Sequence, residues 1–180
     1  TSLKLQLQLA KRNLGEETVP FGVHQKIVKF LDASISQVNR LTHLVEDLLD
    51  IARIQAGKIS FELEETDLSA LVKDVVDRYS DPLKAAACLA ELQLEPGILA
   101  KVDKGRMEQV LVNLISNVIK YAPGKPFTVR LCRPPGEIVC LEVEDRGPGI
   151  SPERLSRVFE RFERASSSRG ISGLGLGLYI

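Results

Sequence analysis

Three short segments carry the residue types that a nucleotide site needs. An apolar stretch, expected to be helical, contains two amides four residues apart, Asn113 and Asn117, and an acidic turn follows at Asp145 to Gly149. A glycine-rich segment from Gly173 to Gly177 comes last. Glycine pairs alone are weak signals, but an amide-bearing helix and an acidic turn upstream supply a metal ligand and a group that reads a base. Together the segments predict a site for magnesium and ATP.

The amide side chains suit a magnesium ion that also binds phosphates. Mg²⁺ prefers oxygen ligands and keeps several waters when it bridges phosphates, so the Asn117 amide oxygen can serve without a carboxylate cage. Asn113 lies one helical turn earlier and faces the same way. Lys120, a turn further on, can place its ammonium group against phosphate oxygens. Two asparagines could instead simply face solvent, but the helix is otherwise apolar and glycine motifs follow it.

The acidic turn is suited to reading an adenine base. Asp145 is expected at the end of a strand, where its carboxylate can accept a hydrogen bond from the adenine amino group. Gly147 and Gly149 let the backbone approach a flat ring closely, although the same residue types also build ordinary turns. Two other phosphate motifs do not fit. The third glycine of a dinucleotide fingerprint would fall at Pro152, and Gly124-Lys125 has no glycine five residues upstream.

The last glycine segment and an arginine before it are expected to bind phosphates. Gly173, Gly175 and Gly177 offer backbone N–H groups and a helix start to the triphosphate. Arg164 carries a fork of donors that could reach the γ-phosphate. A plain surface arginine is the alternative interpretation of that residue.

Composition limits the classes of function. The chain has 180 residues, 44% of them hydrophobic and 27% charged, which is an ordinary globular balance. Lys plus Arg equals Asp plus Glu at 24 each, so neither nucleic acid nor a membrane surface is expected as a partner. Cys88, Cys132 and Cys140 are odd in number and scattered, which argues against a disulfide framework and a zinc site. No stretch approaches the roughly 20 apolar residues that span a bilayer, and we expect a cytoplasmic location, in a parent protein that a membrane could anchor.

Two regions follow from the spacing of apolar residues. Residues 23–56 contain neither proline nor glycine, and their apolar side chains recur at three- and four-residue spacing, which predicts one long helix. Such a helix reaches about 50 Å, so we expect it to pack in an extended bundle across a dimer. The segment Leu3 to Leu14 predicts a preceding helix, and residues 15–22 predict the turn between them. Residues 1–57 are therefore expected to form a helical hairpin, and residues 58–180 a second, mixed domain.

The second region alternates helix and strand signals. Asp67 and Asp103 are expected to cap two helices, the second of which carries the amides. The predicted apolar face of that second helix comprises Met107, Val110, Leu111, Leu114, Ile115 and Val118. Strands are expected at residues 59–63, 91–95, 99–102, 127–131 and 138–143, the last two forming a hairpin that ends at Asp145.

Taken in order, the motifs resemble the ATP-binding domain of bacterial sensor histidine kinases. The stretch from Leu44 to Asp50 also resembles the end of this family's dimerisation and histidine-phosphotransfer hairpin. The resemblance implies an α+β fold, in which a helical hairpin forms a four-helix bundle in a homodimer and a two-layer α/β sandwich of the Bergerat ATPase type follows. The matching motifs are Asn113-x-x-x-Asn117-x-x-Lys120-Tyr121, Asp145-x-Gly147-x-Gly149, Phe159-Glu160-Arg161-Phe162 and Gly173-x-Gly175-x-Gly177-Leu178.

The resemblance also implies a role for each matching residue. Asn117 is the magnesium ligand with Asn113 assisting, and Asp145 reads adenine. The phosphates meet Lys120, Tyr121 and Arg164, and the catalytic residues are Asn113, Lys120 and Arg164. The implied activity is transfer of the ATP γ-phosphoryl group to a histidine, and then to an aspartate on a response regulator. Further residues implied to line the nucleotide are Gly147, Gly149, Ile150, Phe162, Gly173, Leu174, Gly175, Leu176 and Gly177.

The phosphoacceptor motif of this family is not found in the printed sequence. That motif is a histidine followed by an acidic residue and, soon after, by Thr or Asn and Pro. His24 is followed by Gln-Lys-Ile and His43 by Leu-Val-Glu, so both are expected to be surface or bundle-packing residues. Thr1 to Leu3 resembles what directly follows the motif, and we expect both ends of the chain to be cut through a larger protein. The chain as printed is expected to bind nucleotide without phosphorylating itself.

Two other functions stay open at this point. A different Bergerat ATPase, of the gyrase, chaperone or mismatch-repair type, would require a glutamate at position 113 to activate water, and the amide of Asn113 cannot do this. The second alternative is a nucleotide-binding dimer module whose kinase site is degenerate.

Overall fold

The computed structural model describes residues 5, 7, 10, 21–136, 138–163 and 175–180. The chain divides into two compact units, Thr1–Lys58 and Ile59–Ile180. Residues 5, 7 and 10 are helical, while the rest of the predicted first helix and most of the predicted turn lie outside the described residues. The interpretation of residues 1–57 as a helical hairpin therefore stays a prediction.

The long helix of the first unit, α2, spans Phe21–Gln55 and confirms the helix predicted for residues 23–56. It ends in a Schellman motif. The N–H of Lys58 donates to the carbonyl of Arg53 (2.9 Å) and the N–H of Gly57 to that of Ile54 (3.0 Å). Gly57 has a φ of 60°, the left-handed conformation that this motif requires. None of the described helices combines the length and the apolar character that a membrane span needs.

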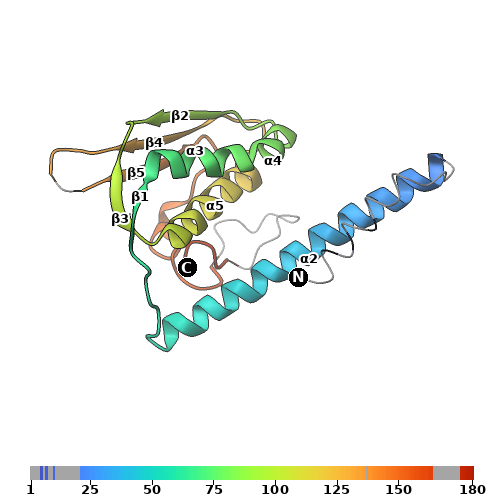
Figure 1. The fold of residues 1–180 in the computed structure, drawn as a ribbon, viewed down its shortest axis with the longest axis horizontal. Coiled ribbons are helices and arrows are strands. Elements are labelled where there is room, and N and C mark those ends of the chain that lie inside the picture. The colour runs from blue at the N-terminus through green and yellow to red at the C-terminus, as the bar shows by residue number, and fades with distance from the viewer. Residues whose placement is uncertain (1–4, 6, 8–9, 11–20, 137, 164–174) are drawn as a thin grey trace. The chain divides into compact units, whose positions relative to one another are not determined.

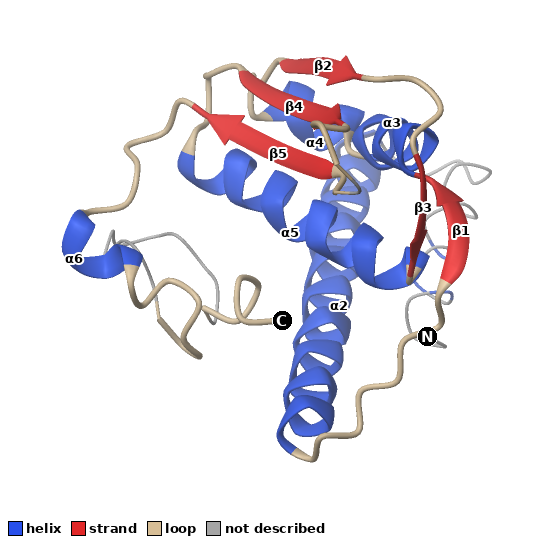
Figure 2. Ribbon diagram, turned by 90° about the vertical axis from the view of Figure 1, so that its left-hand side faces the viewer, coloured by secondary structure: helices blue, strands red, loops and turns tan. Residues whose placement is uncertain are grey.

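The second unit is a two-layer α/β sandwich, which confirms the predicted α+β class (Figures 1 and 2). One layer is a three-stranded sheet in the order β2-β4-β5, in which β2 is parallel and β5 antiparallel to β4. Its strands are β2 (Ala90–Leu94), β4 (Phe127–Cys132) and β5 (Cys140–Asp145). A separate antiparallel pair consists of β1 (Glu64–Asp67) and β3 (Leu99–Val102).

The other layer is helical and lies on one face of the three-stranded sheet (Figures 1 and 2). It comprises α3 (Leu68–Arg78), α4 (Ser80–Ala85) and α5 (Lys104–Tyr121), and a short helix α6 (Pro152–Leu155) follows the sheet. The predicted caps are confirmed, because the side chain of Asp67 accepts the N–H of Ala70 and that of Asp103 accepts the N–H of Arg106. The buried core joins α3, α5 and β4 through Leu71, Val72, Val75, Leu111, Ile115, Val118, Phe127, Val129 and Leu131.

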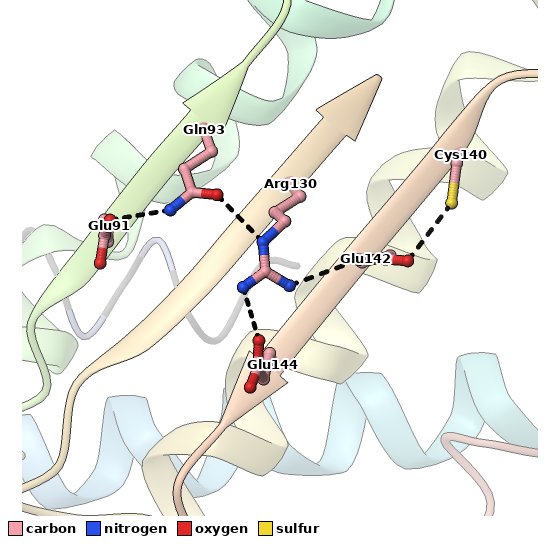
Figure 3. Close-up of polar contacts among 6 residues, drawn as sticks. All are labelled: Glu91, Gln93, Arg130, Cys140, Glu142 and Glu144. Carbon is pink, nitrogen blue, oxygen red and sulfur yellow. Dashed lines mark hydrogen bonds and ion pairs between the residues drawn. The ribbon is translucent and has the colours of Figure 1, made fainter. Parts of the chain in front are cut away.

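The outer face of the sheet is polar. Alternate residues of β4 are buried toward the helices, so Thr128 and Arg130 point to the other side. There Arg130 binds residues of both neighbouring strands: Nε donates to Gln93 (3.0 Å), and the guanidinium forms ion pairs with Glu144 (2.7 Å) and Glu142 (3.5 Å) (Figure 3).

Apart from shifts of one or two residues at strand ends, such as β5 beginning at Cys140, two details of the second unit differ from the prediction. Residues 59–63 are not a strand, and pairing begins at Glu64, opposite Val102. The pairing with β3 does not extend further because Asp103, the residue after Val102, is the N-cap of α5. Its side chain accepts the N–H of Glu62 (3.1 Å). Val110 was expected in the core but is 41% exposed, because it lies on the same helical stripe as Asn113 and Asn117.

Candidate functional site

The amides lie on the solvent side of α5. Asn113, Asn117 and Tyr121 follow one another at four-residue spacing and are partly exposed, while Lys120 in the last turn is exposed. The opposite side of the helix packs into the core through Leu111, Ile115 and Val118. The predicted polar face is therefore confirmed as a partly exposed stripe on the side of α5 that lies away from the core.

The acidic turn meets the end of α5, and Figure 2 shows the tip of β5 beside that end. Asp145 is the last residue of β5 and pairs with Phe127, which points toward the helices, so Asp145 shares that face. Its Oδ1 accepts the N–H of Gly147 (2.7 Å). A Cβ at Gly147 would lie 3.2 Å from the carbonyl oxygen of Tyr121 and 3.4 Å from the Cβ of Ala122, and 2.6 Å from that Oδ1. A side chain here would displace the Asp145 carboxylate and crowd the end of α5, so this close approach favours glycine.

The last glycine segment reaches the same helix from the other end of the sequence. Nδ2 of Asn113 donates a hydrogen bond to the carbonyl oxygen of Gly177 (3.0 Å), across 64 residues. A Cβ at Gly177 would lie 3.3 Å from Cγ of that asparagine. Leu176 is buried, and the N–H groups of Tyr179 and Ile180 bond to its carbonyl oxygen. Asn113 thus holds this segment against α5.

Phe162 and Gly175 form a second tie near the site. The N–H of Phe162 donates to the carbonyl oxygen of Gly175 (2.9 Å), and both residues have positive φ, 63° and 70°. A Cβ at Gly175 would collide with the carbonyl oxygen of Glu163, so this glycine is required by both conformation and space. The Phe162 side chain is 60% exposed.

Some predicted residues lie elsewhere or cannot be placed. Ile150 is partly buried in the loop after Gly149, which has a φ of 71° and open space where a Cβ would be. Arg164, Gly173 and Leu174 lie outside the described residues.

The sequence-based prediction missed three contributors to this region. Ala122, buried directly after α5, forms part of the surface on which Gly147 packs. Glu163 forms an ion pair with Arg157 (3.2 Å), and the guanidinium of Arg161 lies 5.6 Å from the centre of the Tyr179 ring. A small residue at a helix end is a weak sequence signal, so Ala122 could not be singled out. No spacing rule links Arg157 to Glu163, or Arg161 to Tyr179.

The site residues described above offer side-chain amides, the carboxylate of Asp145 and backbone groups. Within the described ranges, no three His, Cys, Asp or Glu side chains gather into a cluster that could hold a metal ion. On the partly exposed stripe of α5, the side-chain amides of Asn113 and Asn117 carry neutral oxygens. Such neutral oxygens suit magnesium that is shared with phosphates.

Comparison with known proteins assigns a family to the region that contains these residues. The family described as "Histidine kinase-, DNA gyrase B-, and HSP90-like ATPase" matches residues 102–180, a range that contains every site residue discussed above. The signal transduction histidine-protein kinase AfsQ2 of Streptomyces coelicolor is 37% identical over 147 residues, which are 81% of this chain and 26% of that protein.

A solved structure extends the likeness to nearly the whole chain. The histidine kinase AdeS of Acinetobacter baumannii is 30% identical, with a TM-score of 0.67, over 97% of this chain and 79% of that one. The chain belongs to the histidine kinase family. A second structure, full-length ShkA in complex with AMPPNP, is 26% identical with a TM-score of 0.69, and the match covers 94% of this chain and 35% of ShkA. The chain thus spans about a quarter of AfsQ2 and a third of ShkA.

Proposed function

We propose that this histidine kinase chain binds Mg-ATP on the exposed stripe of α5 and delivers the γ-phosphoryl group to a histidine, from which it passes to an aspartate of a response regulator. One observation carries the proposal: segments far apart in the sequence converge on α5. Gly177 is tied to Asn113, and Gly147 packs on the backbone of Tyr121. ShkA, whose structure was solved with an ATP analogue, supports nucleotide binding at a fold of this kind.

Asp145 is proposed to read the adenine ring. Its bond to the N–H of Gly147 fixes the rotation of the carboxylate, and Oδ2 can then accept the exocyclic amino group of adenine. Guanine has a carbonyl oxygen at that position, which would face the carboxylate with like partial charge. The proposed contact therefore selects adenine over guanine.

Asn113 and Asn117 are proposed to hold magnesium. Nδ2 of Asn113 is used in the bond to Gly177, so its Oδ1 is the atom that can face a cation, and Asn117 follows on the same stripe. Bound magnesium supplies positive charge to the phosphate oxygens. Lys120, Tyr121 and Arg164 are proposed to donate to the same oxygens, and Gly173 to Gly177 to surround them with backbone N–H groups.

The residue at position 113 favours transfer over hydrolysis. The amide of Asn113 cannot take a proton from water, so it cannot activate water for hydrolysis. The neutral imidazole of a receiving histidine, with an ordinary pKa of about 6.5, is already a nucleophile. The chain's own residues then need to position the phosphates and neutralise their charge. We further propose that the protein works as a homodimer and that, because ATP is its substrate, the reaction takes place in the cytoplasm.

Calorimetric titration of the chain with a non-hydrolysable ATP analogue tests the proposal. One titration contains magnesium and the other contains a chelator. The wild-type chain is expected to bind more tightly with magnesium, and to bind ADP more tightly than GDP. Asp145→Asn should lower affinity for the adenine nucleotide about tenfold or more, because it removes a charged acceptor. The same variant should bind ADP and GDP with more similar affinities, because the amide of the new asparagine can donate to the carbonyl oxygen of guanine.

Asn117→Ala is the matched variant for the metal. It should remove most of the magnesium dependence while the preference for adenine persists. Unaltered binding in both variants would refute these role assignments. Absence of magnesium-dependent binding of the ATP analogue by the wild-type chain would instead favour the dimer module with a degenerate kinase site.

A further inference from the structure

Two cysteines face each other on the outer side of the three-stranded sheet. Cys132, the last residue of β4, is the register partner of Cys140, the first residue of β5. Buried Leu131 points toward the helices, so its neighbour Cys132 and the opposing Cys140 point away from them. Eight positions of sequence separate the two cysteines, yet the sheet places them directly opposite each other.

This arrangement matches the geometry of a disulfide. Directly opposed residues of antiparallel strands have Cα atoms about 4.5–5.5 Å apart, and disulfides span Cα separations of about 4.4–6.8 Å. Both cysteines are free thiols, Cys132 exposed and Cys140 partly exposed. The third cysteine, Cys88, is buried, and its Sγ donates to the carbonyl oxygen of Ala122 (3.5 Å).

The polar face around the pair sets the roles of the two thiols. Sγ of Cys140 donates to Oε1 of Glu142 (3.6 Å), a carboxylate that also pairs with Arg130 (Figure 3). Loss of solvent around Cys140 and the nearby Glu142 carboxylate raise the pKa of Cys140, and the Cys132 thiol adds to the effect. The strand register places the two thiols side by side, and the exposed Cys132 is the one that a reagent meets first.

We propose that Cys132 and Cys140 are a redox-sensitive dithiol, which a low-molecular-weight disulfide such as oxidised glutathione converts to a cross-strand disulfide. The Cys132 thiolate attacks one sulfur of the reagent, forming a mixed disulfide and releasing one glutathione thiol. The Cys140 sulfur, having lost its proton, then attacks Sγ of Cys132 and releases the second. The two protein thiols are oxidised, the reagent is reduced to two thiols, and the protons end on them.

Closure of this bond should stiffen the end of the hairpin that lies away from the nucleotide site. Asp145 is five residues along β5 from Cys140, about 17 Å at the rise of a strand. Adenine-nucleotide affinity should therefore change less than twofold. The midpoint of thermal unfolding should rise by about 5 °C or more, because the bond restricts a short loop of the unfolded chain without distorting the sheet.

The experiment incubates the full chain with oxidised glutathione and measures intact mass, disulfide-mapped peptides and thermal unfolding. The expected product has lost two hydrogen atoms, migrates as a single chain on a non-reducing gel and yields a peptide pair joining Cys132 to Cys140. Cys88→Ser should give the same product. Cys132→Ser and Cys140→Ser should each stop at the mixed disulfide or remain unmodified.

Three results would overturn the proposal. One is a wild-type chain that keeps both thiols, or carries glutathione stably on either of them. Another is a mapped bond that joins Cys88 or a second chain. The third is a disulfide that forms but lowers the unfolding midpoint, since this would show that the native sheet must distort to accept it. The proposal does not depend on nucleotide binding, so a failed titration and a failed oxidation are separate results.

Discussion

Two glycines near the site share one backbone conformation but differ in the space around them. Gly149 and Gly175 have φ values of 71° and 70°. A Cβ on Gly149 would meet nothing within 4 Å, whereas one on Gly175 would collide with the carbonyl of Glu163. The first glycine is therefore required by conformation alone, and the second by conformation and packing.

This contrast predicts unequal effects of the same substitution. Gly149→Ala should lower the free energy of unfolding by about 1 kcal/mol, the cost of a side chain in the left-handed region. Gly175→Ala should lower the free energy of local unfolding by more than twice that amount, because the hydrogen bond from Phe162 to Gly175 must also break. Denaturant unfolding and hydrogen exchange at the Phe162 amide would measure this. Equal effects of the two variants would show that the hydrogen bond from Phe162 to Gly175 does not persist in solution.

At this scale the sequence predicted which residue types would be needed but not which atoms they would contact. The stripe of Asn113 and Asn117 follows from helical spacing and is confirmed. The bond from Asn113 to Gly177 could not be predicted, because 64 residues separate the two and no local rule fixes their meeting. Gly147 was expected to approach a ring, and its closest protein neighbour across the fold is the end of α5.

Among the elements, α5 depends on a cap that serves two segments. Oδ1 of Asp103 accepts the N–H of Arg106, and Oδ2 accepts the N–H of Glu62, which precedes β1. These bonds, that to Arg106 first, hold the pKa of Asp103 below its ordinary value. Asp67 caps α3 through a bond to Ala70.

Asp103→Ala should therefore destabilise the protein more than Asp67→Ala, for which about 1 kcal/mol is expected from loss of a cap. A carboxyl whose folded pKa is lowered stabilises the fold above its unfolded pKa of about 3.9, and this contribution is lost as the pH falls through the folded pKa. The difference between wild type and Asp103→Ala should be constant above about pH 5 and shrink toward pH 3. Urea unfolding across this range would measure it.

Asp103→Asn separates the two bonds of this residue. Asparagine is an equally good cap but offers one oxygen in place of two, so it should keep the helix start and lose the bond to Glu62. Its stability should lie between those of wild type and Asp103→Ala, without the decline in acid that Asp103 causes. If Asp103→Asn is as unstable as Asp103→Ala, the capping role of this residue is contradicted.

The dual role of Asp103 also explains why one strand was misplaced. Residues 59–63 alternate as a strand would, but pairing starts at Glu64, because the partner β3 ends at Val102 and Asp103 begins the turn into α5. Alternation indicates that a segment can pair. The partner strand decides where pairing begins.

For the whole molecule, the exposed apolar stripe of α2 predicts self-association. Phe30, Leu41, Val45 and Leu48 are each more than half exposed and, at 100° per residue, lie within one narrow stripe of the helix. In the proposed dimer this stripe lies in the bundle core. The chain is expected to be a dimer by light scattering, and Leu48→Asp should shift it toward monomer by placing a charge in that core.

Ser36→Asp provides the control, since Ser36 is exposed on the far side of α2 and the added charge is the same. It should leave the dimer intact. A wild-type chain that is monomeric at micromolar concentration, or a Ser36→Asp variant that dissociates as Leu48→Asp does, would contradict the assignment of this stripe to the interface.

The sequence by itself determined the local features of this histidine kinase: the long helix, the caps at Asp67 and Asp103, the amide stripe of α5 and the ordered motifs of a nucleotide site. These depend on residues within a turn or two of one another, so spacing and residue type suffice. Tertiary structure decided which distant segments meet, as in the Asn113 tie to Gly177 and the pairing of Cys132 with Cys140. Those contacts follow from how the core between α3, α5 and β4 packs, which no short stretch of sequence encodes.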